Sequence, residues 1–386
     1  MDIYLDHAST TKVHPLVVAS INESYEKYYA NPSSLHGPGY QALQRIDEAR
    51  DQLLRIVKGK NHHLVFTSGG TESNNTVIMN LADLLRRRSD QWICSSIEHP
   101  SVARPYEYLK EKGAEGTFVG CNTKGQIKLD ELEAAINSGT KIISLMHVNN
   151  ETGIIQPLEE VKDLIKQKNP DLILHVDGVQ AFGKIPVNLQ ELDADYYSIS
   201  AHKLGGPRGV GALFARKPLK LSPLLKGGGQ ERNLRSGTEN TPGILGLETA
   251  ALLRHQKLEE THHIIWEKRR QLIQMLQEQV GEIVVIGAAE DKDQVPGILM
   301  ISVQGTRSEV ILRMLSDDHI YLSSGSACSS KKTSESHVLK AMKLQKKIIE
   351  GALRISYDET LTDEDMQRFV IRLDLHTKQM RKMMKR

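Results

Sequence analysis

The sequence predicts an α/β fold with two parts: a large domain whose mostly parallel sheet is covered by helices on both faces, and a smaller α+β domain. Three observations lead to this prediction. Short apolar runs alternate with helical patterns from about residue 60 onward. The runs are continuously apolar, which is typical of parallel strands buried on both faces. The chain of 386 residues is also long enough for two domains.

The strands of the large domain are expected at seven apolar runs. The first, 64–68, leads into a helix with apolar residues at helical spacing. The others lie at 92–96, 116–120, 141–148, 172–177, 196–200 and 210–216. Helical patterns at 129–138 and 157–168 separate several of them. Because parallel sheets of this kind place their sites at the carboxyl ends of the strands, we expect the functional residues there.

The second domain is expected after a long helical stretch. Residues 243–276 indicate one or two helices that lead to further strands near 297–303 and 352–357. The large domain is therefore an insertion between the first residues and the small domain. The predicted parts are an N-terminal segment near the active site or small domain (1–15), a large domain (16–255) and a small C-terminal domain (256–386).

Composition and charge argue against several classes of protein. The net charge of +2 and the 25% of charged residues favour neither a nucleic-acid nor a membrane partner. No apolar run approaches the roughly eighteen residues of a membrane span, and the acidic N-terminus does not resemble a secretion signal. Three widely separated cysteines, Cys94, Cys121 and Cys328, form no disulfide framework. We expect a cytoplasmic protein without a metal site.

Three features at predicted strand ends suit one cofactor, pyridoxal 5'-phosphate. The backbone N–H groups of Gly70 and Thr71 begin a helix, where the positive end of its dipole favours a phosphate. Asp177 ends a buried strand, where a carboxylate can face a protonated ring nitrogen. Lys203 follows another strand and precedes a glycine-rich turn, and such a lysine can form a Schiff base. Each feature alone is compatible with a simple helix cap or a solvated side chain, but this cofactor needs all three.

Nine motifs extend this reading to a family. They are "YLDHASTT", "FTSGGTESNN", "EHPSV", "MHVNNETG", "HVDGVQAFGK", "SAHKLGGPRGVGALF", "GGGQERNLRSGTEN", "SSGSACSS" and "ALRISY". The motifs occur in this order along essentially the whole chain, which thereby resembles the cysteine desulfurases. These belong to the aminotransferase class V group of fold-type I pyridoxal phosphate enzymes. The resemblance implies conversion of L-cysteine to L-alanine by a homodimer.

The resemblance also implies a role for each matching residue around the cofactor ring. Lys203 would hold the cofactor covalently, and His99 would stack on its ring. Asp177 would pair with the ring nitrogen, and Gln180 would hydrogen-bond the phenolic oxygen. The implied catalytic residues are thus Lys203 and His99, together with Cys328.

Further residues are implied for the phosphate and the substrate. The phosphate would be held by Gly70, Thr71, Ser200 and His202. Thr238 would reach the phosphate of the neighbouring subunit. Asn149, which is also expected beside the cofactor, and Arg354 would bind the substrate carboxylate, because the planar guanidinium can bind a carboxylate with two bonds.

Cys328 lies alone among small polar residues in "SSGSACSSKK", without a second cysteine or a histidine nearby. The resemblance implies that its thiolate takes the substrate sulfur as a persulfide. The substrate amine, His99 or Lys331 could lower the pKa of this thiol. The "SSGSAC" form resembles the long-loop branch of the family. That branch passes sulfur to an acceptor protein, for iron–sulfur cluster assembly or for tRNA or cofactor thiolation.

Alternatives of two kinds stay open at this point. Within the cofactor class, the chain could be an aminotransferase or a selenocysteine lyase, although neither needs the thiol of Cys328. Outside it, the chain could be a non-catalytic homologue that binds partners. Of the remaining candidates, Cys94, Cys121, His147 and His175 are predicted to be packing residues, His262 and His263 lack a second ligand pair for a metal, and His7 and His36 are assigned no direct role.

The sequence departs from the family pattern at three places. Gly178 and Ser9 stand where alanine is common in the family. After "LRIS", where the family usually has a glycine-containing segment, this chain has Tyr357 and Asp358. No departure removes a chemical group that the proposed chemistry needs, so we expect them to change the shape of the site and the activity.

Overall fold

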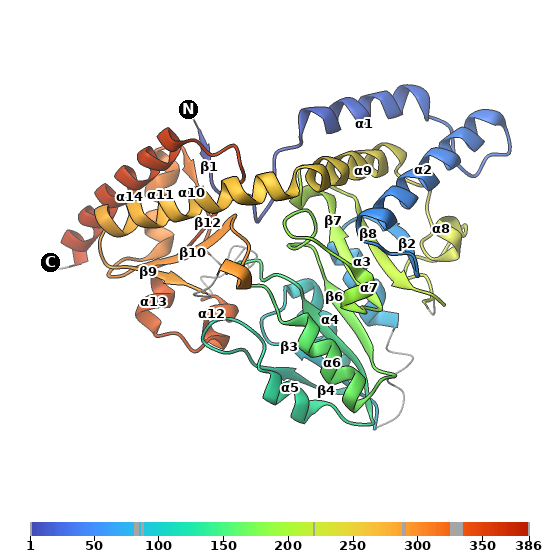
Figure 1. Ribbon diagram of the computed structural model, residues 1–386, viewed down its shortest axis with the longest axis horizontal. Coiled ribbons are helices and arrows are strands. Elements are labelled where there is room, and N and C mark those ends of the chain that lie inside the picture. Colours follow the sequence, from blue (N-terminus) through green and yellow to red (C-terminus); the bar gives the residue numbers. More distant parts are fainter. Residues whose placement is uncertain are drawn as a thin grey trace.

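The computed structural model describes residues 2–80, 85, 89–218, 221–287, 291–324 and 335–384. Figure 1 shows an elongated molecule with two groups of elements, joined by the helices α9 (Thr241–Gln256) and α10 (Leu258–Gln279), which lie end to end along the top. The predicted helical stretch is therefore two helices, separated at Lys257. Cys328 and Lys331 lie outside the described residues.

The larger group contains a seven-stranded sheet with the order β2-β8-β7-β6-β5-β3-β4. Its strands are β2 (His62–Thr67), β3 (Gln91–Ser95), β4 (Glu115–Val119), β5 (Thr140–Met146), β6 (Ile173–Asp177), β7 (Tyr196–Ser200) and β8 (Gly211–Arg216). Only β8 runs antiparallel to its two neighbours; the other pairs are parallel. The predicted α/β fold with a mostly parallel sheet is confirmed, and all seven predicted strands are present.

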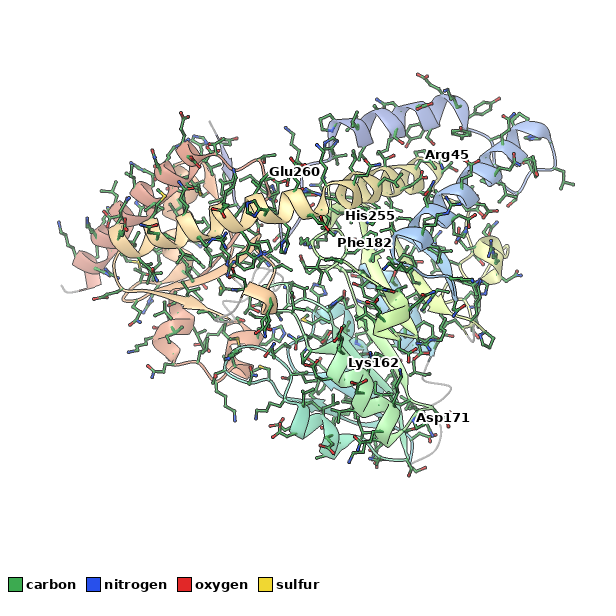
Figure 2. The ribbon with its side chains drawn as sticks, in the orientation of Figure 1. Arg45, Lys162, Asp171, Phe182, His255 and Glu260 are labelled. Atoms are coloured by element: carbon green, nitrogen blue, oxygen red, sulfur yellow. The ribbon has the colours of Figure 1, made fainter. Side chains whose placement is uncertain are left out.

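Helices cover both faces of this sheet. They are α1 (Pro15–Lys27), α2 (Gly37–Ile56), α3 (Gly70–Asn80), α4 (Pro100–Glu111), α5 (Leu129–Ala135), α6 (Leu158–Lys168), α7 (Leu189–Leu192), α8 (Gln230–Asn233) and α9. Adjacent strand residues divide between two cores: Ile143 of β5 packs with residues of α2, α6 and α9, whereas Ile142 packs with residues of α3 and α4. Figure 2 shows Arg45 of α2 beside α9, where it pairs with the buried Glu248.

The smaller group has its own apolar core, which includes Leu272, Leu299, Leu353 and Phe369. Its elements are β1 (Ile3–Tyr4), α10, β9 (Ile283–Ile286), β10 (Ile298–Val303), α11 (Ser308–Asp317), β11 (Ile320–Tyr321), α12 (His337–Ala341), α13 (Lys346–Glu350), β12 (Ala352–Ser356) and α14 (Asp363–Met384). The order β12-β10-β9 is antiparallel, and β1 pairs in parallel with β11. We propose the predicted limits, residues 16–255 and 256–386, as the boundaries of two domains.

Several elements are not indicated by the apolar runs in the sequence. The helices α1 and α2 begin with proline or glycine, and β1 and β11 have only two residues each. None of the described helices is both long enough and apolar enough to cross a lipid bilayer.

Candidate active site

The site lies at the carboxyl edge of the seven-stranded sheet, where the sequence places it. Asp177 is the last residue of β6, and Ser200 is the last residue of β7, the strand beside it. A single 3₁₀ turn, η2 (Ala201–Lys203), follows β7 and carries Lys203. Gly70 starts α3 directly after β2. Residues that are up to 133 positions apart therefore meet because their strands end at one edge.

The N-terminus of α3 forms a cradle that only glycine permits. A Cβ atom on Gly70 would lie 2.6 Å from a methyl group of Val179 and 3.8 Å from the Cβ of Ser200. Without one, the first N–H groups of the helix stay open to a bound anion. Thr71 lines an open hollow of about 570 Å³ together with His99. Gly70 and Ser200 thus lie close together, Thr71 follows Gly70 in the first turn of α3, and their binding of a phosphate stays a prediction.

His202 lies beside this cradle. Its Nδ1 is 3.1 Å from the hydroxyl oxygen of Thr10. Burial, with smaller contributions from Lys203 and Arg208, lowers the pKa of its imidazole to about 4. A neutral ring can donate one hydrogen bond to an anion but contributes no charge, so the positive potential here comes from the helix terminus and from cationic side chains such as Lys203 and Arg208.

Asp177 is buried and held by an amide that the sequence prediction did not include. Its carboxylate accepts hydrogen bonds from Asn74 Nδ2 at 2.8 Å and from the backbone N–H of Val179 at 3.0 Å. Asn74 also donates to the hydroxyl of Ser101 at 2.9 Å. That hydroxyl lies 2.8 Å from Nδ1 of His99. One chain of hydrogen bonds therefore orients both the carboxylate and the ring that are expected to contact the cofactor.

His99 has a second structural role, since it caps α4. Its Nδ1 accepts the backbone N–H of Ser101 at 3.1 Å. Burial lowers the pKa of the imidazole, a shift that Asp177 partly offsets and that Lys203 reinforces. A neutral ring with a fixed orientation can stack on an aromatic cofactor. The orientation of the His99 ring is therefore set by its hydrogen bond to the first turn of α4.

The Lys203 amine points back to the N-terminal segment. Its Nζ donates to the carbonyl oxygens of Ala8 and Ser9, both at 2.7 Å. Gln180 donates from Nε2 to the same Ala8 carbonyl at 2.8 Å, and its Oε1 accepts from Lys184 Nζ at 2.6 Å. Lys203, Gln180 and the first residues of the chain are thus brought together.

Arg354 of β12 is buried and faces the same segment. Its Nη2 donates to Asp6 at 2.8 Å and to the Ser9 hydroxyl at 2.6 Å, and its Nη1 donates to the carbonyl of Asn150 at 2.9 Å. Ser9, one of the departures from the family pattern, therefore supplies a hydroxyl that helps to hold the guanidinium. The ion pair with Asp6 balances the buried charge and fixes the direction of the fork.

Asn149 supports this arrangement from a fully buried position. Its Oδ1 accepts the backbone N–H groups of Glu151 and Thr152, both at 2.9 Å, and its Nδ2 donates to the carbonyl of Ile97 at 3.2 Å. These bonds shape the turn that presents the Asn150 carbonyl to Arg354. In this structure Asn149 builds the turn, and its predicted contact with substrate or cofactor stays a prediction.

Glu151, in the same turn, was not among the predicted residues. Its carboxylate accepts a hydrogen bond from the Ser336 hydroxyl at 2.5 Å. Burial raises the pKa of this carboxyl to about 7, against the opposing effects of Ser336 and Arg354. The side chain links the turn beside Arg354 to the start of α12. Its position within the motif "MHVNNETG" is the signal in the sequence that could have pointed to it.

Two predicted residues are not joined to this group. Thr238 is exposed on the loop after α8, and the structure shows no hydrogen bond from its hydroxyl to the described residues of its own chain. Cys328 is outside the described residues. The roles predicted for both therefore stay predictions.

The departure at Gly178 has a steric cause in this chain. A Cβ atom at position 178 would lie 2.0 Å from a ring carbon of Tyr197, which is fully buried. The hydroxyl of Tyr197 lies 3.0 Å from Nδ1 of His147. A tyrosine on β7 and an alanine after β6 are thus incompatible here, and glycine at 178 makes room for the ring.

We expect Gly178→Ala to destabilise the protein by about 1–3 kcal/mol, the usual cost of overpacking a core. Urea denaturation measures the free energy of unfolding. In the Tyr197→Leu background the same substitution should cost much less, because the ring that it meets is gone. An equal cost in both backgrounds would show that the clash with Tyr197 is not the cause.

The packing residues predicted from the sequence are buried. Cys94 and Cys121 lie in apolar clusters, and burial raises the pKa of both thiols, so neither is suited to be a nucleophile. His175 is fully buried between β5 and β7, with its Nδ1 2.9 Å from the Ser144 hydroxyl, and burial lowers its pKa to about 3. Among the described residues, no three histidine, cysteine or acidic side chains meet as a metal site would require.

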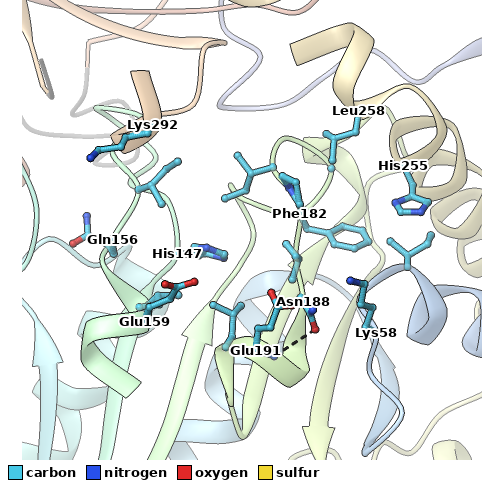
Figure 3. A pocket seen from close by; sticks show the side chains of 18 of the residues that line it. Lys58, His147, Gln156, Glu159, Phe182, Asn188, Glu191, His255, Leu258 and Lys292 are labelled. Carbon is cyan, nitrogen blue, oxygen red and sulfur yellow. Dashed lines mark hydrogen bonds between the residues drawn. The ribbon is translucent and has the colours of Figure 1, made fainter. Parts of the chain in front are cut away.

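A larger hollow, of about 860 Å³, lies elsewhere. It opens between α6, α7 and the junction of α9 and α10, and Figure 3 shows His147, Phe182, Glu191 and His255 around it. None of the predicted catalytic or cofactor-binding residues lines it. The volume of a hollow therefore does not identify the active site in this structure, whereas the meeting of strand-end residues does.

Comparison with known proteins agrees with this geometry. The family model described as aminotransferase class-V matches residues 3–369. A relative named cysteine desulfurase IscS, from Dictyoglomus turgidum, is 36% identical over 365 residues, which cover 95% of this chain and 92% of the relative. The chain belongs to the cysteine desulfurase family of class-V aminotransferases. A cysteine desulfurase from a Nostoc species is 38% identical, with coverage of 95% and 91%.

Solved structures extend the family assignment to the fold. A structure titled "NIFS-LIKE PROTEIN" superposes with a TM-score of 0.90 at 35% identity and covers 97% of this chain and 99% of that one. A second, titled "SspA in complex with cysteine", has a TM-score of 0.79 at 30% identity and covers 92% of this chain and 98% of that one. The class-V aminotransferases are enzymes that depend on pyridoxal phosphate, and this chain is an enzyme of that class. The predicted family and fold are confirmed.

Proposed function

We propose that this enzyme is a cysteine desulfurase that binds pyridoxal 5'-phosphate, converts L-cysteine to L-alanine and passes the sulfur to Cys328. The observation that carries the proposal is that Asp177 and Lys203 lie at one edge of the seven-stranded sheet, and that Lys203 and Arg354 of β12 are both hydrogen-bonded to the segment Asp6–Ser9. An amine, an anion for a ring nitrogen and a carboxylate-binding fork are what an amino-acid substrate and this cofactor require.

The residues present fit the cofactor. The crowded Gly70 leaves helix N–H groups open for its phosphate, with the Thr71 and Ser200 hydroxyls beside them. The buried Asp177 keeps one oxygen on Asn74 and the other on a backbone N–H, so it remains oriented toward the ring position. When bound, this cofactor withdraws electrons from the substrate carbon atoms. Thr238 would complete the phosphate site from the partner.

The residues of the chain supply the remaining steps. Arg354 binds the substrate carboxylate, and the Lys203 amine accepts the proton from the substrate Cα. The Cys328 thiolate attacks the substrate sulfur: the bond between Cβ and sulfur breaks, a sulfur–sulfur bond forms, and the electron pair left on the substrate takes up a proton to give alanine. The outer sulfur atom of the Cys328 persulfide is then transferred to an acceptor protein, which regenerates the Cys328 thiol.

The competing functions have less support. A non-catalytic homologue would have no need of a buried ion pair between Arg354 and Asp6 beside the Lys203 amine. An aminotransferase or a selenocysteine lyase would use most of the same residues, but neither uses the thiol of Cys328. We propose that the enzyme acts in the cytoplasm and that its acceptor serves iron–sulfur cluster assembly or tRNA or cofactor thiolation.

The test of the activity is the formation of alanine from cysteine without a keto acid. The purified enzyme, loaded with pyridoxal phosphate, should release alanine and sulfide in equal amounts when cysteine and a reducing thiol are supplied. Alanine that appears only when a keto acid is added would identify an aminotransferase instead.

We also propose a homodimer, supported by an exposed apolar surface. Large apolar side chains along α1, α2 and the loop between them face solvent in the single chain; they include Leu16, Tyr25, Tyr29, Leu35 and Tyr40. A monomeric protein rarely exposes so many together, and a two-fold dimer is the commonest way to cover such a surface. Thr238, whose hydroxyl bonds to none of the described residues of its own chain, would reach the partner's phosphate.

Mixing two inactive variants tests whether the sites are shared. Lys203→Ala and Thr238→Asp should each be nearly inactive alone. After subunit exchange, a heterodimer has one site with both lesions and one with neither, so activity should return to about half that of the wild type in those dimers. Native mass spectrometry verifies the exchange. Verified heterodimers without activity would show that each site is built from a single chain.

A further inference from the structure

A small cavity lies beside Lys203. Its volume is about 50 Å³, and it is lined by His7, Lys184, Lys203, Tyr357 and Asp358. Thr261 and His262 of α10 also line it, and His262 is partly exposed to solvent. The lining therefore includes both the amine that is expected to carry protons and a residue that solvent reaches.

Two of the residues that line this cavity have a buried polar atom without a partner among the described residues. These atoms are the hydroxyl of Tyr357, whose side chain is only 3% exposed, and Nδ1 of His7. Buried polar groups in proteins are almost always hydrogen-bonded, to protein atoms or to ordered water. A cavity needs roughly 10–15 Å³ of such volume for one water molecule. This cavity therefore has room for a few waters. The Tyr357 hydroxyl and Nδ1 of His7 are the two buried groups that lack a hydrogen-bond partner among the described residues.

Burial, more than the charged groups around the cavity, lowers the pKa values of Lys184 and His7 in its lining. Burial next to Lys203 holds the pKa of the Lys184 amine well below its ordinary value. Burial also lowers the pKa of His7, which faces Asp358, Glu359, Arg254 and Lys184. The charge of Arg254 is already balanced by Glu359 and Asp358. An uncharged imidazole with an open Nδ1 can accept a proton and return it.

We propose that this cavity holds a cluster of ordered waters, anchored by the Tyr357 hydroxyl and by His7, through which the Lys203 amine exchanges protons with solvent. In each transfer an N–H bond of the Lys203 ammonium breaks as an O–H bond forms on a water, and that water gives one of its own protons to Nδ1 of His7. One proton moves and no electron is transferred. The proton path rests on the proposed function; the water site does not.

The anchors are features of this chain. Tyr357 and Asp358 stand where the sequence departs from the glycine-containing segment expected after "LRIS", and a glycine would offer no hydroxyl. His7 and Tyr357 come from the two ends of the sequence and meet because His7 donates its backbone N–H to the carbonyl of Ser356, the residue before Tyr357. The departure at Tyr357 and Asp358 and the N-terminal His7 thus line one polar cavity.

A high-resolution crystal structure of the enzyme without cofactor tests the water site. It should show waters within hydrogen-bond distance of the Tyr357 hydroxyl and of Nδ1 of His7. The Tyr357→Phe variant, which keeps the ring, should lose the water bound to the hydroxyl. A well-ordered cavity without water in the wild type would overturn the proposal.

The proton path is tested by exchange at the Cα of L-alanine, in D₂O, followed by NMR in the Cys328→Ser background, where no sulfur chemistry occurs. His7→Gln and Tyr357→Phe should each slow the solvent exchange by on the order of tenfold, less than the 10²–10⁴ typical of a group that itself transfers the proton. The visible absorbance of the bound cofactor should stay unchanged. His36→Gln, at another N-terminal histidine outside the cavity, is the matched control and should exchange like the parent.

The outcomes separate this proposal from the proposed function. Equal exchange in the parent and in both cavity variants would overturn the proton path. A parent that binds no cofactor and exchanges no Cα proton would overturn the proposed function, and the crystal structure would then decide on the water site alone.

Discussion

Lys203→Ala is expected to lose both the visible absorbance of the bound cofactor and essentially all formation of alanine. The amine is the group that links to the cofactor aldehyde and the group that takes the Cα proton, so one substitution removes both roles. Loss of the acid–base role alone costs roughly 10²–10⁴ in rate. Loss of the covalent link between Lys203 and the cofactor lowers the rate further. Absorbance spectra and alanine release together measure the effect.

The control for this variant is Lys124→Ala, since Lys124 is exposed and its side chain makes no hydrogen bond or ion pair in the described structure. It should behave like the wild type in both measurements. Circular dichroism and the urea midpoint show whether Lys203→Ala is folded. A folded Lys203→Ala protein that keeps the absorbance of a lysine-linked cofactor would overturn the assignment of Lys203.

Cys328→Ser is expected to bind cofactor and cysteine normally yet to release almost no alanine. A hydroxyl is a far poorer nucleophile than a thiolate toward sulfur, so the sulfur–sulfur bond cannot form while every earlier contact stays in place. In the wild type, cysteine without a reductant should add one sulfur atom to the peptide that contains Cys328. Mass spectrometry of digested protein locates it.

Cys121→Ser provides the matched control for this second variant. Cys121 is buried, and burial raises the pKa of its thiol, so it should accept no sulfur, and the variant should turn over like the wild type. Sulfur found on Cys94 or Cys121 in the wild type would contradict the role of Cys328. Full activity of Cys328→Ser would favour a lyase that needs no thiol acceptor.

Much of the fold could be predicted because buried parallel strands leave a strong pattern. All seven strands of the large sheet match apolar runs in the sequence, since strands covered on both faces are mostly apolar. The helices α1 and α2 were not predicted, and the long stretch after residue 242 is two helices. A helix that begins with proline or glycine shows a weak helical pattern in its first residues. A break between two helices such as that at Lys257 depends on tertiary packing.

The residues that position the site were harder to predict than those that would contact the cofactor. Asn74, Ser101 and Asp6 lie within recognised motifs, yet only the structure shows that Asn74 holds Asp177 and that Asp6 holds Arg354. Hydrogen-bond partners 103 and 348 positions apart leave no periodic pattern in a sequence. They become visible only when the strand ends and the chain terminus are placed together.

The sequence by itself determined the α/β class, the family and the chemical groups at the strand ends, because burial periodicity and motif order are properties of the linear chain. Only the tertiary structure decided that Gly178 is required by Tyr197, that Ser9 helps to hold Arg354, and that His7 and Tyr357 share a cavity beside Lys203. Steric fit and unpaired buried atoms depend on distances between residues far apart in sequence. Those distances exist only in the folded chain.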